Sequence, residues 1–121
     1  MNLLDPQVLA AIVERARSVG ARTLMDATQA IPFLDDGEDL TTIDVVLCAA
    51  YKHLLSPRGT AFMATSRAAR AYLQPLAANW RAADQPYGRY FGGPLTLGED
   101  GRAFDVSLAW IAWVGTLESL R

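Results

Sequence analysis

The sequence has little cysteine, little histidine and almost no lysine. Its 121 residues include one cysteine, Cys48, one histidine, His53, and one lysine, Lys52. A single cysteine excludes an internal disulfide and is typical of the reducing cytoplasm, where we expect the protein to be located. The other ten of the eleven basic residues are arginine, and alanine is abundant. Because of this compositional bias, the rarity of lysine is by itself only weak support for a special role of Lys52.

Long apolar runs are also missing. The run at residues 108–114, which no other exceeds in length, is far shorter than the roughly 18 residues that a membrane-spanning helix needs. The first twenty residues contain charged side chains and no apolar stretch before a small-residue cleavage site, so we expect no signal peptide. A net charge of −2 gives no electrostatic reason for binding nucleic acid or a membrane surface. We therefore expect neither as a partner.

The apolar pattern predicts helices alternating with short strands. Asp5-Pro6 is a favourable N-cap and first-turn pair for a helix that ends at Gly20. Three apolar segments predict strands at 23–25, 43–49 and 60–64, and further helices are expected at 66–73 and 107–120. Residues 27–42 are expected to be irregular or briefly helical, and 74–101 to form an aromatic-rich loop. Buried strands flanked by helices predict an α/β fold with parallel strands.

Polar residues follow the first two predicted strands. Asp26 and Gln29 come just after the first, and Lys52 follows the second within three residues. In open α/β sheets, ligands lie beyond the carboxyl ends of the strands. Pyridoxal phosphate (PLP) needs a lysine amine for attachment and a carboxylate beside its pyridine nitrogen. The spacing suits PLP, with Gln29 donating to the phenolate oxygen and Tyr51 or Ser56 reaching the phosphate.

Each of these residues also has a plainer interpretation. An aspartate after a strand often caps a helix or forms a turn, and a loop lysine is usually solvated. The pattern around His53 indicates a packing residue rather than a base. Cys48, inside an apolar strand, is predicted to be a small core residue. Trp110 and Trp113 are predicted to lie on the core side of the last helix.

Three segments carry a family resemblance. Residues 24–30, Leu-Met-Asp-Ala-Thr-Gln-Ala, resemble the Asp-x-x-Gln element of class V aminotransferase-like enzymes, which are fold-type-I PLP proteins. Residues 50–62, Ala-Tyr-Lys-His-Leu-Leu-Ser-Pro-Arg-Gly-Thr-Ala-Phe, resemble the Schiff-base segment of the same family. The order and spacing of the two elements also match. Residues 102–107, Arg-Ala-Phe-Asp-Val-Ser, are similar to a third element of that family.

The resemblance implies a PLP cofactor and the large-domain α/β fold of PLP-dependent transferases. It implies that Lys52 carries the cofactor as a Schiff base, that Asp26 pairs with the pyridine nitrogen, and that Gln29 bonds the phenolate oxygen. Tyr51 and Ser107 would contact the phosphate. In the full-length relatives Ser107 would do so across the interface of a homodimer.

The branch that the chain resembles most contains the hercynylcysteine sulfoxide lyases, related to the cysteine desulfurases. This implies a C–S lyase acting on a cysteine-derived amino-acid substrate. His53 stands where the family usually has tryptophan and receives no catalytic role. Because the resemblance covers only the middle portion of such an enzyme, we expect a fragment that is incomplete for catalysis. A non-catalytic remnant, a piece of a split protein, and a fragment of a cysteine desulfurase or aminotransferase remain alternatives.

Overall fold

The computed structural model describes residues 5–34 and 39–121 and divides into two compact units. The first unit consists of the described residues up to Ser66 together with Trp110–Arg121. The second consists of Arg67–Ala109. The first unit is a small α/β structure built on a three-stranded sheet. Within the described ranges, every helix is too short or too polar to cross a membrane.

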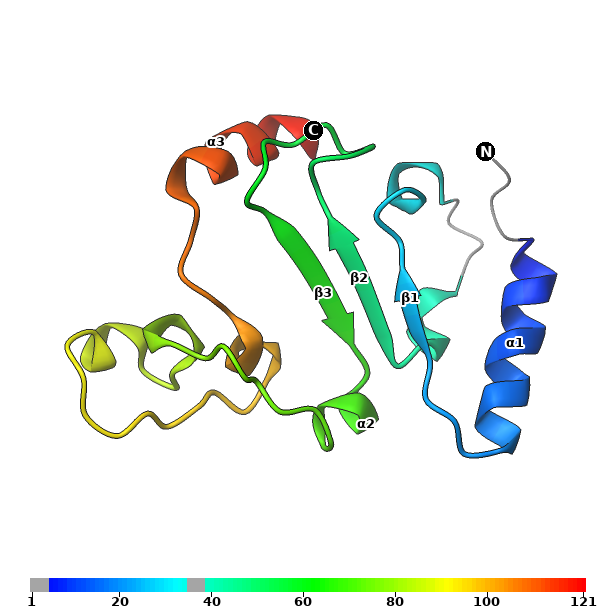
Figure 1. The fold of residues 1–121 in the computed structure, drawn as a ribbon, viewed down its shortest axis with the longest axis horizontal. Helices are drawn as coiled ribbons and strands as arrows, with labels where there is room; N and C mark the ends of the chain where they lie inside the picture. The colour runs from blue at the N-terminus through cyan, green and yellow to red at the C-terminus, as the bar shows by residue number, and fades with distance from the viewer. Residues whose placement is uncertain (1–4, 35–38) are drawn as a thin grey trace. The chain divides into compact units, whose positions relative to one another are not determined.

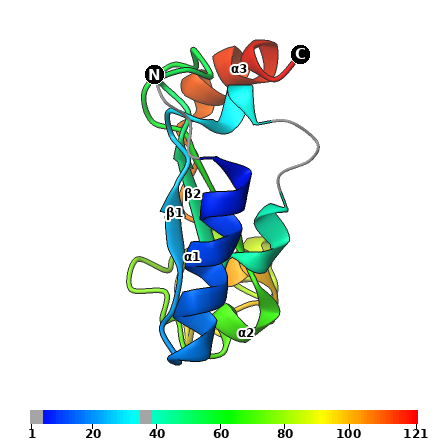
Figure 2. The same ribbon diagram turned by 90° about the vertical axis from the view of Figure 1, so that its right-hand side faces the viewer.

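Helix α1 spans Pro6–Ser18 and begins as the sequence predicts. The Asp5 carboxylate accepts a hydrogen bond of 2.8 Å from the backbone N–H of Gln7, which satisfies one of the free donors of the first turn. Gly20 has a φ of +72° and ends the helix in the left-handed conformation that glycine adopts without strain. Val13 is buried on the side of α1 that faces the sheet (Figure 2).

The sheet is formed by β1 (Leu24–Asp26), β2 (Val45–Ala49) and β3 (Ala61–Thr65), in that order (Figure 1). β1 and β2 are parallel, as predicted, but β2 and β3 are antiparallel, so the prediction of parallel strands is wrong for β3. A parallel pair needs a crossover of about a dozen residues or more, usually a helix. Residues 50–60 form turns instead and return the chain directly.

The two faces of the sheet differ in their cover. Val46 packs with Val13 of α1, and Met25 of β1 joins this core. Phe62, on the same face because it pairs with Cys48, meets the Trp113 ring edge-to-face with centroids 5.5 Å apart. The helices α1 and α3 (Trp110–Ser119) therefore cover one face. Successive strand residues point to opposite faces. Asp26 and its partner in β2, Leu47, therefore lie on the face that these helices do not cover.

Helix α3 is held against the turn before β3 by buried hydroxyl groups. Thr116 is fully buried and donates a hydrogen bond of 2.8 Å to the Ala112 carbonyl oxygen. The hydroxyl oxygens of Thr116 and Thr60 lie 3.0 Å apart in a second, buried hydrogen bond. The preceding residue, Gly115, lies directly against the Pro57 ring.

The outer side of α3 is apolar and exposed. Trp110 is 70% exposed, so the prediction that it lies in the core is wrong, whereas Trp113 is partly buried. At about 100° per residue, Trp110 lies on the opposite side of the helix from Ala112. The helix also begins at Trp110 rather than after Ser107, which lies in an extended segment.

The segments outside the sheet and the long helices are mostly single turns. Residues 27–34 and 39–42 are irregular apart from two short 3-10 helices, Ile31–Phe33 and Leu40–Thr42, while the rest of the predicted irregular stretch, 35–38, lies outside the described residues. In the second unit, α2 (Arg67–Arg70) is shorter than predicted. The aromatic-rich segment holds three 3-10 helices, Trp80–Ala82, Pro86–Arg89 and Gly101–Phe104.

Ser56 gives a first testable prediction. The residue is buried, and its Oγ has no hydrogen-bond partner among the described residues. A buried hydroxyl without a partner costs about 1–3 kcal/mol, so Ser56→Ala is expected to raise the free energy of unfolding by about 1 kcal/mol in urea denaturation. Ser18→Ala, at an exposed position, is the control and should have little effect. A lower stability of Ser56→Ala than of the wild type contradicts the prediction.

Candidate functional site

The candidate site lies at the carboxyl ends of β1 and β2, on the face that α1 and α3 leave open. The parallel register places Asp26 beside Leu47, and the Ala27 N–H continues the pairing with a 2.7 Å bond to the Leu47 carbonyl. Asp26 is exposed at this edge. The short apolar strand before it and the buried Ala27 after it fix where the carboxylate leaves the sheet.

Thr28 organises the turn after β1. Its backbone N–H donates to Asp26 Oδ1 at 3.0 Å, the arrangement of an Asx turn. Its buried side-chain Oγ1 accepts from the Ala49 N–H at 2.9 Å. That bond replaces the next rung of the ladder between β1 and β2 after β1 has ended.

The Asp26 carboxylate is held in its ionised form. The pKa of Asp26 lies below its ordinary value of 3.8, first because of hydrogen bonding from the Thr28 side chain and then because of the Thr28 backbone N–H. Slight desolvation opposes this effect, and the positive charge of Lys52 lowers the pKa further. Asp26 is therefore an anion at neutral pH, within electrostatic reach of Lys52.

Lys52 lies in the loop 50–60, which closes on itself between β2 and β3. The Ala50 N–H bonds the Thr60 carbonyl at 3.1 Å, and the Leu55 N–H bonds the Lys52 carbonyl at 2.9 Å. Leu55 has a φ of 55°, a left-handed conformation that is rare for a bulky residue and costs of order 1–3 kcal/mol. The loop thus stores strain next to an exposed lysine.

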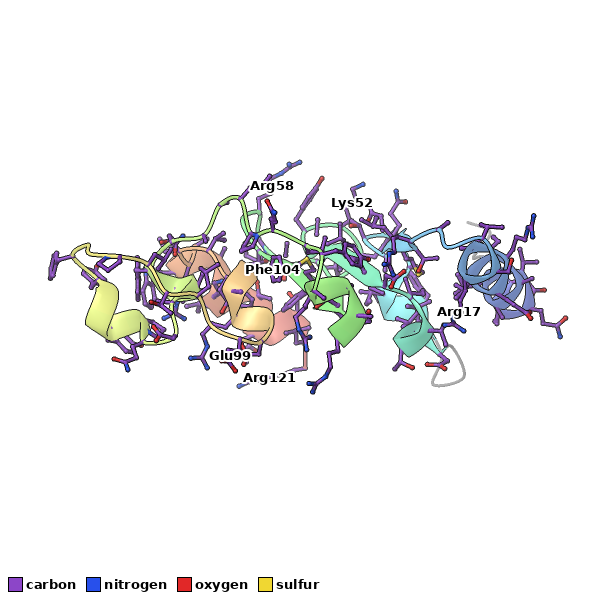
Figure 3. All side chains as sticks on the ribbon, turned by 90° about the horizontal axis from the view of Figure 1, so that it is seen from below. Arg17, Lys52, Arg58, Glu99, Phe104 and Arg121 are labelled. Atoms are coloured by element: carbon purple, nitrogen blue, oxygen red, sulfur yellow. The ribbon has the colours of Figure 1, made fainter. Side chains whose placement is uncertain are left out.

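Lys52 has aromatic neighbours on both sides in the sequence, Tyr51 and His53. The Arg58 guanidinium lies 4.4 Å from the centroid of the Tyr51 ring, a cation–π distance. Lys52 and Arg58 extend on the same side of the sheet (Figure 3). His53 meets Phe33 edge-to-face at 5.3 Å, which ties the loop to the 3-10 turn that follows Gln29. The predicted packing role of His53 agrees with this contact.

Cys48 lies beneath the site and not in it. It is 4% exposed in β2, which confirms the prediction of a core residue. Burial raises the pKa of the Cys48 thiol above its ordinary value of 9.0, and the negative charge of Asp26 raises it further. The thiol therefore stays protonated at neutral pH and is a poor nucleophile.

Four of the five predicted cofactor residues belong to the same edge of the first unit: Asp26, Gln29, Tyr51 and Lys52. Gln29 is exposed on the turn after Thr28. Ser107, the fifth, belongs to the second unit and is exposed in the extended segment before α3. Within residues 5–34 and 39–121, no cluster of His, Cys, Asp and Glu has a metal-binding arrangement.

Two residues of this edge were not predicted from the sequence, Thr28 and Arg58. The Asp-x-Thr spacing is itself a signal for an Asx turn and identifies the contact of Thr28 with Asp26. The contact of Arg58 with Tyr51 depends on the path of the loop 50–60. The sequence indicates that this segment turns, but not which of its side chains meet.

No family model, curated protein or solved structure matches the chain.

Proposed function

We propose that the edge formed by β1 and β2 binds PLP, with Lys52 as the attachment residue and Asp26 as the partner of the pyridine nitrogen. The observation that carries the proposal is an ionised aspartate at the end of one strand with the only lysine of the chain just past the end of its parallel neighbour. The resemblance to class V aminotransferase-like enzymes supports the same assignment. It favours their large-domain fold and a C–S lyase acting on a cysteine-derived amino acid.

The chemistry of the residues fits this cofactor. PLP, when bound, supplies an electron sink for the bonds at the substrate α carbon. The Asp26 carboxylate is an anion at neutral pH and can hold a proton at the pyridine nitrogen. The Gln29 side-chain amide can donate to a phenolate oxygen. The phenol of Tyr51 and the guanidinium of Arg58, already in contact, complement a phosphate. In this proposal Ser107 contributes a further phosphate contact from the partner subunit of a homodimer.

Lys52 has two tasks in the proposed reaction. Its Nζ, exposed on the loop 50–60, would hold the cofactor through the cofactor aldehyde and would be set free when the substrate binds. The freed Nζ then accepts the proton from the substrate α carbon. Cys48 takes no part, because its thiol is buried and protonated.

The test uses the single lysine. The chain is mixed with PLP, reduced with borohydride, and mapped by peptide mass spectrometry. Lys52→Arg is the matched control, because it keeps the positive charge near Asp26 and leaves the α-amino group as the only primary amine. We expect one adduct, on Lys52, formed with a visible absorption band that the variant lacks. Labelling of the wild type no faster than that of free N-acetyl-lysine overturns the proposal and favours a non-catalytic remnant.

A further inference from the structure

Thr28 makes contacts that a simple turn residue does not need. It is 6% exposed, and its backbone N–H and side-chain oxygen are both used, toward Asp26 Oδ1 and from the Ala49 N–H. A threonine hydroxyl has one proton to donate. With the oxygen accepting from Ala49, that proton is free for the neighbouring carboxylate. Thr28 therefore joins the Asp26 carboxylate to the end of β2.

We infer that Thr28 is a positioning residue, which orients the Asp26 carboxylate toward a bound cationic ring and locks β1 to the strand that leads to Lys52. This inference rests on the proposed function of the site. The direction of the Asp26 pKa shift agrees with it, since the Thr28 side chain is the largest cause of that shift.

The contact of the hydroxyl with the Ala49 N–H explains why threonine suits the position. The Ala49 N–H comes directly before Ala50, where the chain leaves the sheet, and a donor left unpaired there weakens the base of the loop 50–60. Serine keeps the hydroxyl and loses only a methyl group. Valine keeps the branched shape and loses the hydroxyl, with its bond to the Ala49 N–H and its proton next to Asp26. Comparison of the serine and valine variants therefore separates the effect of the hydroxyl group from the effect of side-chain packing.

The first measurement uses the chain without PLP. The Asp26 side-chain carboxyl is titrated by carbon NMR in the wild type, Thr28→Val and Thr28→Ser. We expect its pKa to rise toward the ordinary value in Thr28→Val and to stay near the wild-type value in Thr28→Ser. Thr28→Ala is a second variant without the hydroxyl, and is used if the valine variant does not fold. An unchanged Asp26 titration in the hydroxyl-free variant overturns the inference.

The second measurement is PLP affinity. We expect about tenfold weaker binding by Thr28→Val and restored affinity in Thr28→Ser, because one hydrogen bond to a charged group is lost. A loss of unfolding free energy with wild-type titration and affinity shows a merely structural role and also overturns the inference. Absence of the Lys52 adduct in the wild type refutes the proposed function instead, while the cofactor-free titration still tests the contact between Thr28 and Asp26.

Discussion

Replacing Gly115 with alanine is expected to lower the free energy of unfolding by about 1–3 kcal/mol, the usual cost of overpacking. In an exposed helix interior the same change stabilises by about 1 kcal/mol, because glycine is a poor helix former. Here a Cβ at position 115 would lie 2.5 Å from Pro57 Cγ and 2.8 Å from Pro57 Cδ. The proline ring has little freedom to move aside, so α3 or the loop 50–60 must shift.

That shift also affects the hydroxyl pair one residue away. Displacing α3 separates Thr116 from Thr60, whose 3.0 Å bond is fully buried. Urea unfolding followed by tryptophan fluorescence measures the loss. Gly101→Ala is the matched control, because nothing lies within 4 Å of a Cβ at that position, and its stability should stay close to wild type. A Gly115→Ala variant as stable as the wild type would show that α3 does not rest on Pro57.

The parts of the fold that could be predicted from the sequence are those fixed by neighbouring residues. Helix α1 begins at an Asp-Pro cap and ends at a glycine, both of which act within one turn. The three strands were found because each is a short apolar segment between turn signals. The direction of β3 was missed, because strand polarity depends on the length and path of the connection rather than on the strand itself.

The same distinction applies to α3. Its apolar sequence indicates a helix, but which side is buried depends on what it packs against. The contacting positions include Gly115 and Thr116, small or polar residues that an apolar pattern does not select. The larger Trp110 is left exposed. Hydrophobicity alone therefore predicted the wrong position for Trp110, although Trp113 does pack against the sheet.

At the candidate site, the sequence placed Asp26 and Lys52 just beyond two predicted strands; in the structure Asp26 is the last residue of β1, and Lys52 follows the end of β2 at Ala49. The sequence could not supply the contact of Thr28 with Ala49, since these residues are 21 positions apart and meet only through the parallel register of β1 and β2. The sequence thus singled out the two charged groups, and the structure added the contact of Thr28 with Asp26.

Replacing Asp26 with asparagine is expected to weaken PLP binding by about 10–100-fold. Hydrogen bonds to charged groups contribute about 1.5–3 kcal/mol, and about 1.4 kcal/mol corresponds to a factor of ten. Asparagine has nearly the same size but cannot carry the negative charge that, in the proposed function, would keep the pyridine nitrogen of PLP protonated. The measurement is the dissociation constant from the absorption of the Lys52 adduct in the wild type and in Asp26→Asn.

The pH dependence supplies a second readout of the same carboxylate. The pKa of Asp26 is depressed below 3.8 in the folded protein. Its stabilising contribution is therefore complete above 3.8 and disappears as the pH falls through the lower folded value. Asp26→Asn should remove this acid-side loss of stability.

Asp26→Glu separates the charge from its position. Glutamate keeps the negative charge but extends it by one methylene, away from the Thr28 N–H that holds Asp26 Oδ1 at 3.0 Å. If both charge and position matter, its PLP affinity lies between those of the wild type and Asp26→Asn. Wild-type affinity in Asp26→Asn would contradict a pyridine-nitrogen role for Asp26. If Asp26→Glu binds PLP as tightly as the wild type while Asp26→Asn does not, the negative charge is needed but its orientation by Thr28 is not.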